Sequence, residues 1–252
     1  MDFKNKVVLV TGAGAGIGRA TAILYAKSGA KVVVNEINEI KGRETLAEVS
    51  KYSEGLLAVG DVSNAQDAKR MIDSTVQKFG RLDILVNNAG IVLPGRVDNT
   101  PEDDWDKTMK VNVRGVFLMS KYAVEQMKKR GGGVIVNSAS SVALKGVKDR
   151  ASYSASKGAV LSLSRAMAAD YMDDHIRVNC ICPGTTLTPS LEERLKAFPD
   201  PEKARTEFIA RQPMKRLGVD TEIAQAILFA SCTEAEFMNG SILSIDGGMT
   251  CC

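Results

Sequence analysis

Histidine is almost missing from this chain of 252 residues, in which His175 is the only one. A single histidine excludes metal sites built from several histidines, and it leaves little room for a serine–histidine–aspartate triad. We therefore expect no resident metal ion. Any acid–base chemistry that the protein performs must use other side chains.

Long apolar runs, a charge excess and a disulfide framework are missing as well. The longest apolar stretches are too short to span a bilayer. Lysine and arginine number 33 against 30 aspartates and glutamates, and a net charge of +3 gives no reason to expect binding to nucleic acid or to a membrane surface. The cysteines are odd in number and form no CxxC pair, and no apolar signal core follows Met1, so we expect free thiols and a cytoplasmic location. The cysteines are Cys180, Cys182, Cys232, Cys251 and Cys252.

Seven short runs rich in Val, Ile and Leu predict β-strands. They are Val7–Val10, Lys31–Val34, Leu56–Val59, Leu82–Asn87, Gly133–Asn137, Arg177–Ile181 and Ile242–Ile245. Each run is apolar on both faces, and amphipathic helical patterns fill the intervals, which is typical of a parallel, doubly wound sheet covered by helices on both sides. We predict an α/β fold in which residues 1–252 form one domain.

Local signals mark where individual helices begin. Ser63-Asn64-Ala65-Gln66 fits a capping box with Ser63 as the N-cap, and Thr100 before Pro101 fits an N-cap before a proline in the first turn. Residues 184–218 break the alternation of strands and helices and hold four of the seven prolines. We interpret them as an insertion that covers a ligand at the carboxyl end of a strand.

A glycine-rich turn follows the first predicted strand, in the segment Thr11–Gly18. Glycines let backbone N–H groups approach a pyrophosphate at the start of a helix. Glu36 stands 24 residues after Gly12, where an acidic side chain suits the ribose hydroxyls of adenosine and repels a 2′-phosphate. Because the turn also lacks an arginine, we expect NAD rather than NADP. The alternative is that Glu36 is a solvated loop residue.

Tyr153 and Lys157 are four residues apart at the start of a helical pattern, so they share one helix face. A cation beside a phenol stabilises the phenolate and lowers a pKa that is otherwise about 10. The pair can therefore serve as a general acid and base near neutral pH without histidine. An incidental helix pair is the other interpretation of these two residues alone.

Taken together, the motifs resemble those of the short-chain dehydrogenase/reductase family from Lys6 to Gly248. The glycine turn fits TGxxxGxG, Asn87-Asn88-Ala89-Gly90 fits NNAG, and Pro183-Gly184 with Thr188 fits PGxxxT. Ser140, thirteen residues before Tyr153, fits the family's catalytic serine better than its neighbours Ser138 and Ser141. The resemblance implies a Rossmann-type fold and these cofactor-binding residues: Gly12, Gly16, Ile17, Gly18, Glu36, Asp61, Val62, Asn88, Ala89, Gly90, Tyr153, Lys157, Pro183, Gly184 and Thr188.

The same resemblance implies hydride transfer between NAD and a secondary alcohol or ketone, with four catalytic residues. Tyr153 would move the hydroxyl proton, and Ser140 would hold the substrate oxygen. Lys157 would support the tyrosine and bind the nicotinamide ribose, and Asn112 would hold a water that links Lys157 to solvent. The family is usually tetrameric and sometimes dimeric, so we expect a homotetramer, with helices near Glu102 and Tyr153 in the contacts.

The insertion resembles that of cytosolic 3-hydroxybutyrate dehydrogenases and of 2-keto-3-deoxy sugar-acid dehydrogenases of the fuconate pathway. That resemblance carries substrate-binding arginines onto Arg150, Arg194 and Arg211. Arginine binds carboxylates through paired, charge-assisted hydrogen bonds. We therefore favour a small hydroxy acid or sugar acid as substrate. The other interpretation is that each arginine is a solvated surface residue.

Three further functions are compatible with the sequence. A neutral sugar, polyol or cyclic alcohol could be the substrate. A 3-oxoacyl-thioester reductase commonly uses NADPH, which Glu36 disfavours. An NAD-binding regulator without catalysis has no need for the set formed by Asn112, Ser140, Tyr153 and Lys157.

Overall fold

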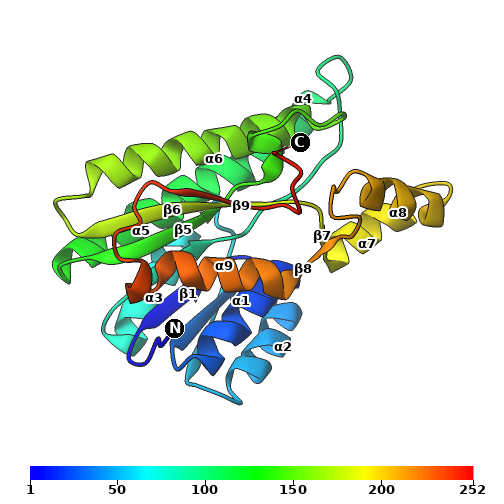
Figure 1. Cartoon of the computed structure of the whole chain (residues 1–252). Helices are drawn as coiled ribbons and strands as arrows, with labels where there is room; N and C mark the ends of the chain where they lie inside the picture. The colour runs from blue at the N-terminus through cyan, green and yellow to red at the C-terminus, as the bar shows by residue number, and fades with distance from the viewer. Residues whose placement is uncertain (252) are drawn as a thin grey trace.

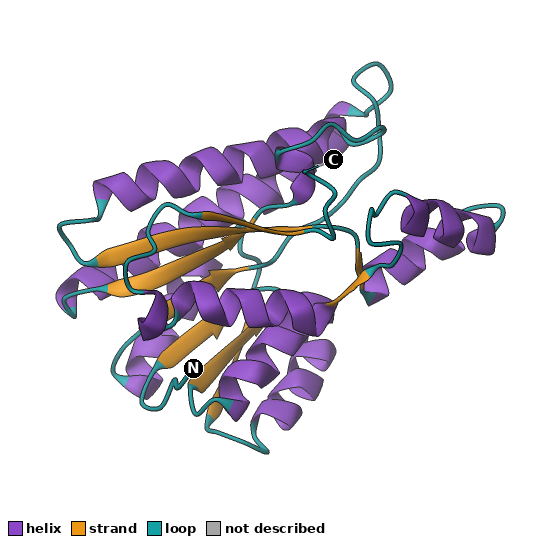
Figure 2. Cartoon of the chain, in the orientation of Figure 1, coloured by secondary structure: helices purple, strands orange, loops and turns teal. Residues whose placement is uncertain are grey.

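A seven-stranded parallel β-sheet forms the centre of the protein, with helices on both faces (Figures 1 and 2). The computed structural model describes residues 1–251. The strands are β1 (Val7–Val10), β2 (Lys31–Glu36), β3 (Gly55–Val59), β4 (Ile84–Asn87), β5 (Gly133–Ser138), β6 (Ile176–Pro183) and β9 (Ile242–Ile245), in the spatial order β3-β2-β1-β4-β5-β6-β9. The predicted fold class is confirmed, and the predicted strands differ from these by at most two residues at an end.

Helices cover each face of the sheet and bury its apolar side chains. Helices α1 (Gly16–Lys27), α2 (Glu39–Val49) and α9 (Asp220–Ser231) lie on one face, and α3 (Ala65–Phe79), α5 (Gly115–Lys129) and α6 (Ala151–Asp170) lie on the other (Figure 1). Each layer has its own apolar core, which contains Tyr25 on the first face and Met119 on the second. This double cover explains why the strands are apolar on both sides.

Two of the predicted helix N-caps are wrong, because a different residue occupies the N-cap position. Helix α3 is capped by Asn64, whose side chain accepts from Gln66 N and Asp67 N, while Ser63 Oγ donates to Asp61 instead. Helix α4 (Glu102–Met109) has no side-chain cap, because Thr100 Oγ1 donates to Arg96 O at 2.6 Å in the preceding loop. In both cases the hydroxyl donates a hydrogen bond to another polar group nearby instead of capping the helix.

The insertion forms a two-helix arm that projects from the sheet (Figure 2). Strand β7 (Thr186–Leu187) leads into α7 (Pro189–Lys196) and α8 (Pro201–Ala210), and β8 (Gly218–Val219) pairs with β7 on the way back. The two helices pack on a small core of their own that includes Leu191, Leu195 and Phe208. The arm is therefore a compact unit joined to the body through a two-stranded stem.

The order of the strands creates a crevice beside β1. The chain moves from β1 outward to β2 and β3, and then returns to β4 on the other side of β1. At such a switch point the loops diverge at the carboxyl ends of the strands, where α/β proteins bind ligands. Within residues 1–251 the structure has no helix both long enough and apolar enough to cross a membrane.

Candidate active site

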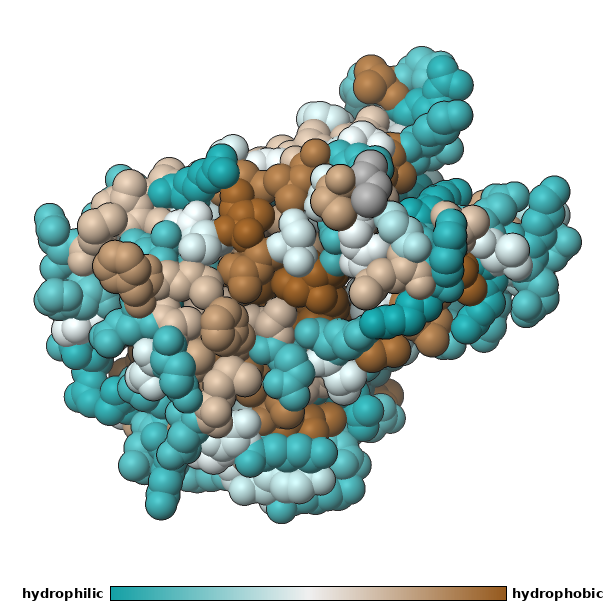
Figure 3. Space-filling model, in the orientation of Figure 1, coloured by the Kyte–Doolittle hydropathy of each residue, from teal (hydrophilic) through white to brown (hydrophobic). Residues whose placement is uncertain are grey.

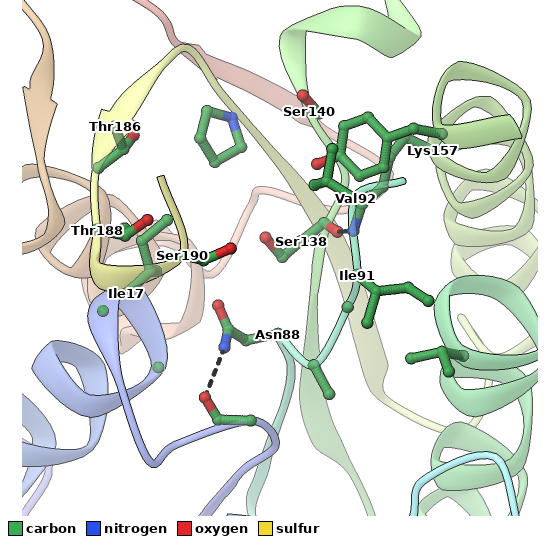
Figure 4. Close-up of a pocket in the computed structure, with 18 of the residues that line it drawn as sticks. Ile17, Asn88, Ile91, Val92, Ser138, Ser140, Lys157, Thr186, Thr188 and Ser190 are labelled. Carbon is green, nitrogen blue, oxygen red and sulfur yellow. Dashed lines mark hydrogen bonds between the residues drawn. The ribbon is translucent and has the colours of Figure 1, made fainter. Parts of the chain in front are cut away.

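One cavity of about 700 Å³ opens at the carboxyl ends of the strands. Figure 4 shows it between the start of α1 at Ile17, the arm residues Thr188 and Ser190, and the side chains of Ser140 and Lys157. Apart from Asn112, every residue that we predicted for the site lines this cavity. Residues from the whole length of the chain therefore meet there.

The glycine-rich turn is shaped for close approach of a ligand to the backbone. Gly12 and Gly16 have left-handed φ angles of 61° and 49°. A Cβ on Gly18 would lie 2.1 Å from Gly12 O, so a larger residue cannot occupy that position without a shift. Helix α1 has no side-chain cap at Ala15, which leaves first-turn N–H groups available to an anion. This arrangement suits a pyrophosphate.

The loop after β4 is tied to the same turn. Asn88 Nδ2 donates to Thr11 O at 3.0 Å and to Gly12 O at 3.2 Å (Figure 4). The backbone N–H groups of Asn88 and Ala89 donate to Thr11 Oγ1. These bonds hold the Asn87–Gly90 segment against the glycine turn and give the floor of the cavity a fixed shape.

Glu36 closes the end of the cavity beside β2. Its carboxylate accepts hydrogen bonds from three backbone N–H groups, those of Gly14 (2.9 Å), Ile37 (3.1 Å) and Asn38 (3.2 Å). The carboxylate is thus fixed in position rather than free in a solvated loop. A fixed negative charge here is suited to accept from ribose hydroxyls and to repel a phosphate.

Tyr153 and Lys157 lie on one face of α6, as the spacing predicts. Lys157 Nζ is 5.8 Å from the centre of the Tyr153 ring and donates to Ser138 O at 2.7 Å (Figure 4). Lys157 is buried, and its positive charge therefore acts on the phenol through little water. Ser140 lines the same part of the cavity, at the end of β5.

Ser138, Ser140 and Ser141, which the sequence analysis compared for the position of the catalytic serine, have different contacts. Ser138 contributes its backbone carbonyl to Lys157. Ser141 Oγ is 3.5 Å from Met249 Sδ. Within residues 1–251, the one hydrogen bond of Ser140 Oγ is long and is accepted from Val142 N at 3.4 Å, so its hydroxyl donor is left for a ligand.

Asn112 lies behind the cavity wall, fully buried. It is in a π-helical turn (Lys110–Arg114) between α4 and α5, a distortion often found at functional sites. Its side chain exchanges two hydrogen bonds with the backbone of Ile91 and donates to Ser156 Oγ at 3.0 Å. Sequence reasoning missed Ser156, although its position next to Lys157 in the helix is a usable signal.

The three predicted arginines converge on the end of the cavity that holds Tyr153. Burial and the charge of Arg211 lower the pKa of Arg150, and burial and the charge of Arg150 lower the pKa of Arg194. Arg150 and Arg194 are half-buried, whereas Arg211 is exposed and has its guanidinium 4.5 Å from the centre of the Phe208 ring. No ion pair among residues 1–251 involves any of the three.

Local structure fixes how Arg150 enters the cavity. Asp149 has a left-handed φ of 56°, and the segment Asp149–Ala151 is hydrogen-bonded to Gly95 on both sides. Arg150 NH1 donates to Asp149 O at 2.6 Å. The arginine is held at the start of α6, three residues before Tyr153, which places positive charge next to the phenol.

Comparisons with known proteins agree with this geometry. The family whose sequence model is described as "Enoyl-(Acyl carrier protein) reductase" matches residues 12–250. An uncharacterized oxidoreductase of Thermotoga maritima is 56% identical over 99% of both chains, and dehydrogenase/reductase SDR family member 6 of Xenopus laevis is 41% identical over 97% of both. A crystal structure of NAD⁺-bound xylitol dehydrogenase superposes with a TM-score of 0.93 at 34% identity and covers 98% of this chain and 100% of that one.

Proposed function

Because this chain belongs to the short-chain dehydrogenase/reductase family, we propose that it is an NAD-dependent dehydrogenase of a small hydroxy acid, sugar acids included. Family membership establishes an oxidoreductase that acts on alcohol or ketone substrates. Two observations support the finer statement. Glu36 is fixed by three backbone N–H groups at one end of the cavity, and three arginines that form no ion pair among residues 1–251 line the cavity as well.

The arginines carry the proposal for the substrate. Positive charges brought together in a partly buried cavity are costly unless an anion joins them. Burial and mutual repulsion both act on Arg150, as the lowering of its pKa indicates. A carboxylate relieves this repulsion and accepts several charge-assisted hydrogen bonds, which orients the neighbouring carbinol carbon.

In the proposed reaction each catalytic side chain has one task. When bound, the nicotinamide supplies the redox chemistry by accepting the hydride that leaves the carbinol carbon. Tyr153 Oη takes the hydroxyl proton, and Ser140 Oγ donates a hydrogen bond to the same substrate oxygen. Lys157 Nζ stabilises the negative charge on the phenol oxygen. Asn112, held by Ile91 and Ser156, keeps the segment around Gly90 in place behind Lys157.

We expect Arg150→Met, Arg194→Met and Arg211→Met each to raise the KM for a hydroxy acid by about 10- to 100-fold. A lost hydrogen bond between charged groups costs about 1.5–3 kcal/mol, and 1.4 kcal/mol corresponds to a factor of ten. The KM for a neutral secondary alcohol should change little. Initial rates of NAD reduction with both substrate types measure the difference.

Arg205→Met is the matched control, because Arg205 lies on α8 of the same arm but does not line the cavity. It should leave both KM values unchanged. Equal effects of the three cavity variants on acids and neutral alcohols would contradict a carboxylate substrate. A screen of the wild-type enzyme with 3-hydroxybutanoate, sugar acids, polyols and cyclic alcohols separates the proposal from the neutral-substrate alternative.

We also propose that the protein forms a homotetramer. Strand β9 has a free edge, and a band of apolar surface lies over it between α6 and α9 (Figure 3). Phe229 on α9 is 44% exposed, and Trp105 and Phe117 are exposed on α4 and α5. Sedimentation equilibrium should give four times the monomer mass of 27.0 kDa. Phe229→Lys should lower that mass, because it places a charge in the apolar band, whereas a wild-type monomer would contradict the proposal.

A further inference from the structure

The C-terminal turn contributes a side chain to the active-site cavity. Gly247 and Gly248 have left-handed φ angles of 61° and 85°, which turn the chain back after β9. The buried Asp246 carboxylate fixes this turn by accepting from Gly248 N, Thr250 N and Thr250 Oγ1. Sequence reasoning did not select Met249, which the turn brings to the cavity wall.

Met249 is held on several sides. Its N–H donates to Asp246 O at 3.2 Å, and its carbonyl oxygen accepts from Lys145 Nζ at 2.9 Å. Its sulfur lies 3.5 Å from Ser141 Oγ, next to Ser140 in the chain. Only 7% of the residue is exposed. The thioether is therefore a fixed part of the wall beside the catalytic serine.

The same turn also contacts the segment that follows Arg211. Met214 N donates to Gly247 O at 3.2 Å, and the open side of Gly248 faces Pro213. The part of the cavity that binds the acid group and the part that Met249 lines are thus built from segments that pack on each other.

Met249 is one of several apolar side chains that line the cavity, together with Val142 and Val147 from the loop that follows Ser140. Hydroxyl groups line the cavity as well, those of Ser141, Thr186 and Thr188 among them. An alkyl group of a substrate gains free energy when it is buried against the apolar side chains.

We infer that Met249 limits the length of the alkyl group that the substrate carries. The inference rests on the proposed function for the acid group. The carboxylate binds the arginines, the hydroxyl lies at Ser140 and Tyr153, and the remaining alkyl end meets Met249.

The test is the ratio of kcat/KM for 3-hydroxyhexanoate to that for 3-hydroxybutanoate. We expect Met249→Ala to raise this ratio about tenfold or more, since one methylene in a fitted pocket changes kcat/KM by about tenfold or more. Met249→Val is a milder change and should raise this ratio less. It replaces Met249→Ala as the test if the alanine variant does not fold. Met214→Ala is the matched control, because Met214 touches the same turn, is 64% exposed and does not line this cavity.

The outcomes separate the two proposals. If wild-type enzyme oxidises hydroxy acids and the ratio is the same in all variants, the role of Met249 is wrong and the proposed function stands. If no hydroxy acid is oxidised, the proposed function fails. The same ratio measured with 2-hexanol and 2-butanol then decides whether Met249 limits chain length.

Discussion

Tyr153→Phe should reduce kcat by about 1,000-fold, because a positioned general acid or base contributes about 100- to 10,000-fold to a rate. The substitution removes one oxygen and keeps the ring that stands 5.8 Å from Lys157 Nζ. The shape of the cavity is thus preserved while the proton acceptor is lost. Single-turnover NADH formation should fall with kcat, and the dissociation constant for NAD, measured by fluorescence quenching, should change little.

Tyr171→Phe provides a matched control on the same molecule. Tyr171 follows the end of α6 and carries a lysine at a similar position, with Lys128 Nζ 5.1 Å from its ring centre, but it does not line the cavity. This variant should keep full activity. Turnover that survives in Tyr153→Phe would overturn the mechanism, and NAD binding without turnover in the wild-type protein would favour the regulator instead.

Glu36→Ala should lower the preference for NAD over NADP, expressed as the ratio of kcat/KM values, by about 100-fold or more. Loss of two hydrogen bonds to a charged carboxylate costs NAD about 3 kcal/mol, which is about a factor of 100. NADP gains in addition, because the charge that repels its 2′-phosphate is gone. The three N–H groups of Gly14, Ile37 and Asn38 that now bind the carboxylate then become free to bind a phosphate.

Glu39→Ala is the control for this prediction. Glu39 lies three residues further on, pairs with Arg43 on the exposed side of α2 and does not line the cavity. Its removal should leave the cofactor ratio as it is. An unchanged ratio in Glu36→Ala would remove Glu36 from cofactor selection and reopen the choice between NAD and NADP.

Sequence patterns predicted the fold because they depend on local periodicity. Apolar runs such as Val7–Val10 mark strands that helices cover on both sides, and the glycine spacing in Thr11–Gly18 marks a turn between a strand and a helix. The pair Tyr153 and Lys157 required only the helical repeat. The predicted N-caps at Ser63 and Thr100 are wrong because a hydroxyl can hydrogen-bond to any of several nearby groups. Which group it binds depends on neighbours that a local sequence pattern does not contain.

Asn112 shows what a motif leaves out. The resemblance identified the residue, but not its surroundings in a π-helical turn. The Asn112 side-chain amide donates to Ile91, 21 residues earlier in the chain, and to Ser156, 44 residues later. No spacing rule connects those three positions. They meet because the loop after β4, the junction of α4 and α5, and helix α6 pack at one corner of the sheet.

The sequence by itself determined the α/β class, the glycine-rich turn and the Tyr153–Lys157 pair, because these follow from patterns within one element or between consecutive elements. Only the tertiary structure decided how the arginine-lined end of the cavity is built. Arg150, Arg194 and Arg211 come from the start of α6 and from both helices of the arm, and Met249 comes from the final turn. Side chains so far apart in the chain act on one molecule only when packing of the sheet, arm and C-terminal turn brings their charges and apolar surface together.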